Sequence, residues 1–122
     1  MIINKTNKKK IAGRYLECSS ILSQIRGMMF RKKVIPLVFT FSEERKVNLH
    51  SFFCKEMDLV FLNSKFEVVE MKKNWKPFSF YSSKRKAKFL LELPTGSIYK
   101  RIELGDLFSV GSETKLNPSF LV

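Results

Sequence analysis

Hydrophobic residues in this chain fall into short runs that polar turns separate. Each run is rich in β-branched and aromatic residues and has the length of a strand. The predicted strands are Pro36–Phe41, Lys46–Phe53, Asp58–Leu62, Phe66–Met71 and Ala87–Leu93. Asn63-Ser64-Lys65 separates two of them closely enough for a hairpin. The pattern therefore predicts a mainly antiparallel β domain.

The strand Ala87–Leu93 shows the clearest alternation. Its odd-numbered positions are apolar, whereas Lys88 and Glu92 stand among the even-numbered ones, which predicts one inner and one outer face. Pro94-Thr95-Gly96 then ends the strand. After it we expect one or two helical turns at Ser97–Leu104 and a final strand at Leu107–Val110.

One segment has a helical pattern instead. It follows a short strand at Ile11–Cys18, and Ser19 or Ser20 can cap it. Its apolar positions recur at helical spacing, with Gly27 near the end: Ile21, Leu22, Ile25 and Met28 or Met29. Because no βαβ alternation follows, we predict an α+β fold, a small, mainly antiparallel, β-barrel-like domain with one principal short helix.

The chain has the size of a single domain. It holds 122 residues, of which 44% are hydrophobic, enough for one core. Residues 1–10 have little to bury and predict a flexible basic tail, residues 11–111 a single β-rich domain, and residues 112–122 a loose C-terminal tail.

Charge is the most unusual feature of the composition. The 23 Lys and Arg residues outnumber 11 Asp and Glu residues and give a formal charge of +12. This balance favours nucleic acid or another polyanion as partner, although the charge is spread along the chain and is also typical of an ordinary solvated surface. With two cysteines, no export signal and no apolar run of transmembrane length, we expect a cytoplasmic protein with reduced thiols.

Several short motifs, taken together, resemble a known family. They follow one another in order: Arg26-Gly27-Met28-Met29-Phe30-Arg31, His50-Ser51-Phe52-Phe53, Asp58-Leu59-Val60-Phe61-Leu62-Asn63, Lys76-Pro77-Phe78, Leu91-Glu92-Leu93-Pro94-Thr95-Gly96 and Gly105-Asp106. In this respect the chain resembles the archaeal branch of the uncharacterised family called domain of unknown function 192, from about Cys18 to Val110. The resemblance implies a small β-rich, barrel-like fold with a short helix, and it implies no biochemical role.

Two residues carry the only catalytic hypothesis. His50 and Cys54 stand four residues apart, a spacing that allows a thiolate–imidazole pair, although a buried free cysteine more often serves simple packing. The chain has only one histidine and two cysteines, without a Cys-x-x-Cys motif, so we predict no metal and no cofactor.

Two acidic residues stand in apolar strands. Asp58 and Glu92 must be paired, hydrogen-bonded or facing a cleft there, and we prefer a structural ion pair with Arg26 or Arg31 to a role as general acid or base. The ligand-binding candidates are Arg26, Arg31, His50, Asp58 and Glu92.

The densest interleaving of basic and aromatic residues lies between residues 72 and 86. This composition is typical of surfaces that stack nucleobases and neutralise phosphates, although the aromatic rings would also suit a plug at one end of a barrel. The nucleic-acid candidates are Lys72, Lys73, Trp75, Lys76, Phe78, Lys84 and Arg85.

Two functions follow from these patterns. The first is a non-enzymatic binding module for an anionic ligand such as RNA. The alternative is a small Cys/His-dependent hydrolase-like or redox enzyme built on His50 and Cys54.

Overall fold

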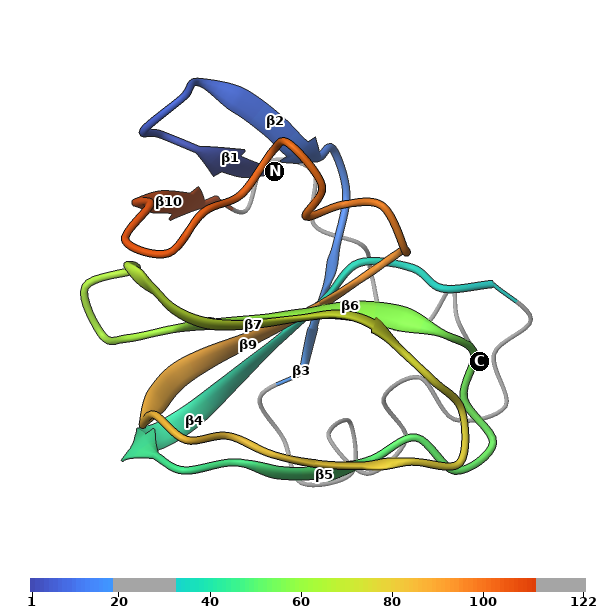
Figure 1. Ribbon diagram of the computed structural model, residues 1–122. Coiled ribbons are helices and arrows are strands. Elements are labelled where there is room, and N and C mark those ends of the chain that lie inside the picture. The colour runs from blue at the N-terminus through green and yellow to red at the C-terminus, as the bar shows by residue number, and fades with distance from the viewer. Residues whose placement is uncertain (19–32, 112–122) are drawn as a thin grey trace.

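The computed structural model describes residues 1–18 and 33–111, and within these ranges every regular element is a strand (Figure 1). The strands are β1 (Ile2–Asn4), β2 (Lys9–Ala12), β3 (Leu16–Cys18), β4 (Leu37–Arg45), β5 (Asn48–His50), β6 (Met57–Leu62), β7 (Val68–Trp75), β8 (Phe80–Ser82), β9 (Ala87–Leu93) and β10 (Phe108–Val110). No helix of the described part is long and apolar enough to cross a membrane.

The strands form three layers (Figure 1). The middle layer is a five-stranded sheet with the order β3-β4-β9-β6-β7, in which only β3 and β4 pair in parallel. The sheet β10-β1-β2 covers one side of it, called the upper side here, and the ribbon β5-β8 covers the other, lower side. The middle sheet therefore builds a core on each face.

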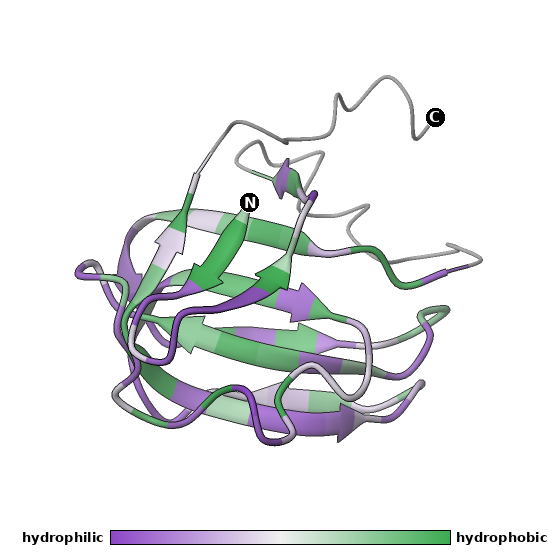
Figure 2. Ribbon diagram, turned by 90° about the horizontal axis from the view of Figure 1, so that it is seen from above, coloured by the Kyte–Doolittle hydropathy of each residue, from purple (hydrophilic) through white to green (hydrophobic). Residues whose placement is uncertain are grey.

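Strands β6 and β9 are buried on both faces. Every residue of Met57–Leu62 is buried, and alternate residues pack in different cores, with Val60 and Leu62 in the upper one and Leu59 and Phe61 in the lower one. Figure 2 shows hydrophobic stretches, coloured green, along the strands of the sheets. The prediction of one outer face for Ala87–Leu93 is wrong, because Leu90 packs in the lower core and Glu92 is buried.

The predicted α+β, barrel-like fold is also wrong. The described ranges contain strands only, and their three sheets stay open, because the middle sheet buries its faces against two covering layers and ends in the edge strands β3 and β7. The predicted helix, with Ser19 to Met29, lies outside the described residues. At Ser97–Leu104 there is a turn, where Arg101 N and Ile102 N both donate to Ile98 O, at 2.9 and 3.0 Å.

The first ten residues form a hairpin, so the prediction of a flexible tail is wrong for them. Ile2 and Asn4 are fully buried, and β1 pairs with β2 on one side and β10 on the other. The Asn4 side-chain amide donates to Asp106 Oδ2 at 2.6 Å and to Arg101 O at 3.0 Å. One buried apolar side chain, one buried amide and the pairing with β2 and β10 thus hold this segment in place despite its lysines. Residues 112–122 lie outside the described part.

Candidate functional site

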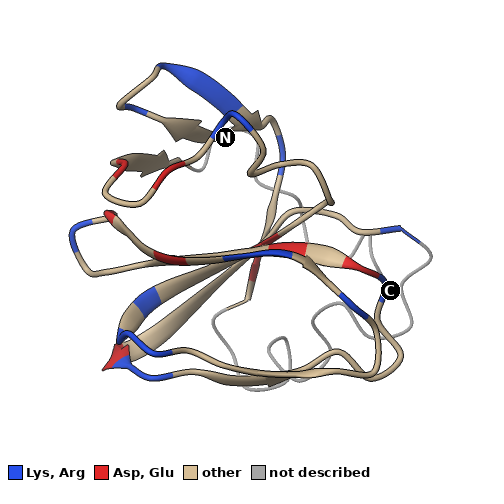
Figure 3. Ribbon diagram, viewed as in Figure 1, with Lys and Arg blue, Asp and Glu red and all other residues tan. Residues whose placement is uncertain are grey.

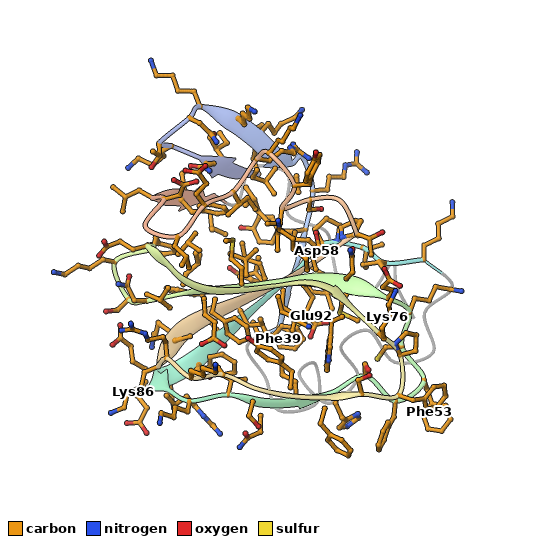
Figure 4. The ribbon with its side chains drawn as sticks, in the orientation of Figure 1. Phe39, Phe53, Asp58, Lys76, Lys86 and Glu92 are labelled. Atoms are coloured by element: carbon orange, nitrogen blue, oxygen red, sulfur yellow. The ribbon has the colours of Figure 1, made fainter. Side chains whose placement is uncertain are left out.

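Asp58 and Glu92 lie on opposite faces of the middle sheet. Asp58 is opposite Leu93 in the pairing of β6 with β9, and Glu92 is opposite Leu59, so the two carboxyl groups occupy successive rungs and point to opposite sides. Figure 4 shows Asp58 at the upper side and Glu92 at the lower side. The structure therefore does not bring the two carboxyl groups together in one cleft.

Asp58 joins two chain segments. Its Oδ1 accepts a hydrogen bond from Asn74 N at 2.9 Å, and its Oδ2 accepts one from Ile98 N at 3.1 Å. Asn74 stands at the irregular end of β7 with a φ of 52°, and Ile98 opens the turn after β9. The two backbone amides satisfy the buried carboxylate, which explains a charge at this position without a ligand.

Glu92 is a buried carboxyl group on the lower side of the middle sheet. Its side of the sheet is apolar, with Leu37 and Leu59 as its neighbours on β4 and β6, and only 6% of its surface is exposed. No described group bonds its Oε1. Burial raises the pKa of Glu92 to about 8, so the group is mainly protonated at neutral pH. Arg26 and Arg31, its predicted ion-pair partners, lie outside the described residues.

His50 and Cys54 each bond to the backbone of the loop between them. His50 Nδ1 accepts from Phe52 N at 3.3 Å, and Cys54 Sγ donates to Phe52 O at 3.5 Å. Burial and, second, the nearby Glu92 raise the pKa of the Cys54 thiol to about 11. A thiol of this kind holds its proton at neutral pH and is a poor nucleophile. Within residues 1–18 and 33–111, no group of three His, Cys, Asp or Glu side chains has the geometry of a metal site.

The nucleic-acid candidates separate into several places. Trp75 is buried in the lower core, with no described partner for its indole N–H. Lys76 bonds Glu56, with 2.6 Å between Nζ and Oε1. Lys84 and Arg85 lie at the far end of the β5-β8 ribbon, where their backbone amides donate to Glu70. The remaining candidates, Lys72 and Lys73 on the edge strand β7 and Phe78 in the loop after it, are exposed.

Lys73 belongs to a group of cations around an exposed ring, which we call the Tyr99 cluster: Lys9, Lys73, Tyr99, Lys100 and Arg101. Lys73 Nζ and Lys100 Nζ lie 6.0 and 5.4 Å from the centre of the Tyr99 ring, which is 63% exposed. Lys9 Nζ donates to Lys100 O at 3.0 Å, and the Arg101 guanidinium donates to Lys10 O. Three distant segments thus place four cations together.

Between the described residues, no Asp or Glu side chain forms an ion pair with a cation of this cluster. In Figure 3, Lys and Arg residues mark β2, β7 and the segment before β10. Sequence reasoning missed the cluster because its members come from three segments. The run Tyr99-Lys100-Arg101 was the one local signal, an aromatic ring followed by two cations.

A second exposed group contains only hydrocarbon rings, and we call it the Phe cluster: Phe52, Phe53, Phe78 and Phe80. Ring centres lie 5.1 Å apart for Phe52 and Phe80, 6.2 Å for Phe52 and Phe78, and 5.7 Å for Phe53 and Phe78. The His50 ring adjoins Phe52 at 5.0 Å. The cluster joins the β5–β6 loop to the β7–β8 loop and the start of β8.

The chain is similar in sequence to members of one protein family. The model of the family DUF192, described as "Uncharacterized ACR", matches residues 3–110. A UPF0127 protein of Thermococcus sibiricus is 38% identical over 111 residues, which cover 87% of this chain and 71% of that protein. A UPF0127 protein of Pyrococcus furiosus is 36% identical over 109 residues, covering 86% and 93% of the two chains. These matches confirm the resemblance that the sequence motifs indicated.

Two solved structures share the fold. A Sinorhizobium meliloti protein has a TM-score of 0.73 at 20% identity, covering 78% of this chain and 79% of the other. A protein of unknown function from Novosphingobium aromaticivorans also has a TM-score of 0.73, at 16% identity, covering 79% and 74%.

Proposed function

The chain belongs to the DUF192 family, and from that premise we propose that it is a non-enzymatic cytoplasmic module that binds single-stranded RNA through the Tyr99 cluster. The observation that carries the proposal is the exposed Tyr99 ring between Lys73 and Lys100, without an acidic partner in the described part of the chain. A ring of this kind can stack on an unpaired base, while the ammonium groups beside it bind phosphates.

The arrangement of the cations supports an extended anionic ligand. Lys72 and Lys73 are exposed on β7, an edge strand of the middle sheet, and Lys76 follows directly after its end. Neighbouring residues of a strand point to opposite faces, so Lys73 faces Tyr99 whereas Lys72 points to the other side, and Lys76 is paired with Glu56. The cations of the Tyr99 cluster come from three chain segments, so they can contact several phosphates of one strand, whereas a single small anion would use only part of them.

The alternative enzyme has weaker support. It requires a thiolate at Cys54, but the raised pKa of that thiol favours the protonated form. The His50 ring bonds the backbone of Phe52 instead. We therefore argue for the binding module alone.

Fluorescence anisotropy with labelled RNA of about 12 uridines tests the proposal, a length within the usual site sizes for single strands. If four cations contact phosphates, affinity falls about 50-fold between about 50 and 200 mM salt. Tyr99→Ala weakens binding about 5- to 150-fold, the range expected for one lost stacking contact. Lys73→Ala with Lys100→Ala weakens binding and makes it less salt-dependent.

The matched control is Lys84→Ala with Lys86→Ala, which removes the same charge from two exposed residues at the far end of the β5-β8 ribbon. This pair should leave most of the affinity intact. Equal losses in both double variants would show that the overall charge, rather than the Tyr99 cluster, attracts RNA. Absence of binding at low salt would refute the proposal altogether.

A further inference from the structure

The Phe cluster exposes a large apolar ring surface to the solvent. Phe53, Phe78 and Phe80 are 54%, 66% and 76% exposed. With about 200 Å² for each ring, they present roughly 400 Å² of hydrocarbon to the solvent. This area equals the largest apolar patch on a typical monomer, and such patches often mark interaction sites.

The backbone around the cluster holds the rings in place. Phe53 and Phe78 have φ values of 61° and 55°, in the left-handed region that bulky residues seldom adopt. The buried Ser51 fixes both loops, because its Oγ donates to Lys76 O at 2.5 Å and accepts from Ser79 N at 2.9 Å. Its carbonyl oxygen accepts from Cys54 N and Phe78 N, each at 3.1 Å. These hydrogen bonds fix the two loops against each other, so the four rings form one surface of defined shape.

The shape of the cluster fits some partners better than others. The rings are tilted by 32° to 75° from one another, so they offer no common plane on which successive bases could stack. A stable dimer needs about 800 Å² from each partner, roughly twice what the three exposed rings supply. A lipid surface needs neither a plane nor a large complementary area, because protruding rings insert one by one among the acyl chains.

The charge around the cluster selects the kind of lipid. Lys55 follows the Phe52-Phe53-Cys54 segment directly, and Lys76 precedes Phe78 by two residues, with both lysines exposed. Lys76 also pairs with Glu56, but this pair is exposed and therefore weak, and the three charges together leave one net positive charge beside the rings. Figure 4 shows Lys76 and Phe53 at the same end of the molecule, opposite Lys86. Apolar rings bordered by ammonium groups are typical of surfaces that dock on anionic headgroups.

We propose that the Phe cluster docks on an anionic lipid surface, with its rings among the acyl chains and with Lys55 and Lys76 at the headgroups. This docking is independent of RNA binding at the Tyr99 cluster. Its test is flotation of the full chain with vesicles of phosphatidylcholine alone and with about 30% phosphatidylglycerol, a fraction that gives the surface a negative potential.

The decisive variant is Phe78→Gly with Phe80→Ser, since glycine accepts the positive φ at position 78 without strain. The variant should bind the anionic vesicles at least about tenfold more weakly than the original chain, because two inserted rings are lost. Phe80→Ser alone, at a position with ordinary strand geometry, should show an intermediate loss. The matched control is Leu104→Ser with Leu107→Ser, which removes two exposed apolar side chains near β10 and should keep the affinity.

Three results would overturn the proposal. The first is absence of vesicle binding by the original chain, and the second is an equal loss in the leucine control. The third is an effect of the phenylalanine variant elsewhere, either a tenfold loss of RNA affinity or the disappearance of a dimer in light scattering, with vesicle binding unchanged. Failure of the RNA experiment at Tyr99 leaves the vesicle result unaffected, since the variants share no residue.

Discussion

Replacement of the buried Glu92 by glutamine should change how the stability of the protein depends on pH. Burial raises the pKa of Glu92 from 4.5 to about 8 in the folded chain. Between these values the folded protein keeps a proton that the unfolded chain has released. The free energy of unfolding therefore falls as the pH rises through this interval, and the contribution of Glu92 is most favourable below pH 4.5.

The size of the effect follows from the shift. One pKa unit corresponds to 1.36 kcal/mol, so the rise from 4.5 to about 8 amounts to at most about 5 kcal/mol over the interval. Glu92→Gln has nearly the same shape and cannot ionise. It should cost a constant ~1–3 kcal/mol for its imperfectly bonded amide. The variant should then be less stable than the original chain at pH 4.5 and more stable at pH 8.5.

Urea unfolding at several pH values between 4.5 and 8.5 measures this difference. Trp75 is the only tryptophan of the chain and is buried in the lower core, so its fluorescence reports unfolding of the same layer that holds Glu92. Glu103→Gln, at an exposed position, serves as the control and should follow the original chain. If the curves for the original chain and for Glu92→Gln run parallel across the whole pH range, the reasoning about Glu92 is refuted.

Three further predictions concern single residues. Asp58→Asn replaces one carboxylate oxygen, an acceptor, by an amide donor that faces a backbone N–H. The variant should lower the free energy of unfolding by ~1–3 kcal/mol in urea titration. An unchanged midpoint would contradict the view that Asp58 holds the two chain segments together. Asn4→Ala removes the bonds to Asp106 and Arg101 and should cost a similar ~1–3 kcal/mol; a normal stability would mean that the hairpin is dispensable. Cys54 should react with iodoacetamide at pH 8 about 10- to 100-fold more slowly than a free cysteine, as measured by peptide mass spectrometry, and rapid alkylation would reopen the enzyme alternative.

The sequence predicted local features of the fold better than long-range ones. The predicted strand Ala87–Leu93 coincides with β9, because a run of apolar and β-forming residues between clear turn signals needs no knowledge of its neighbours. Whether Glu92 faces solvent or a second core depends on the ribbon β5-β8, which is distant in sequence. The pattern of one strand could not contain that information.

The candidate sites show the same limit. Trp75 lies among lysines in the sequence, a pattern that favoured an exposed ring. Its position opposite Met57 in the sheet instead directs the side chain toward the lower core. Tyr99 becomes a candidate only when β7 brings Lys73 beside it. Side-chain pairs of this kind depend on register and on chain crossings, which hydrophobic periodicity does not specify.

The pairing of β1 with β10 has a consequence for the order of events during synthesis. Ile2 and Asn4 lie near the beginning of the chain, but one of the two strands beside them is Phe108–Val110, and the Met1 ammonium donates to Gly111 O at 2.8 Å. While the ribosome translates the middle of the chain, β1 can pair only with β2, because β10 has not yet been synthesised. The upper layer can close only after β10 has left the exit tunnel, so we expect it to form later than the middle sheet, whose last strand in the sequence is β9.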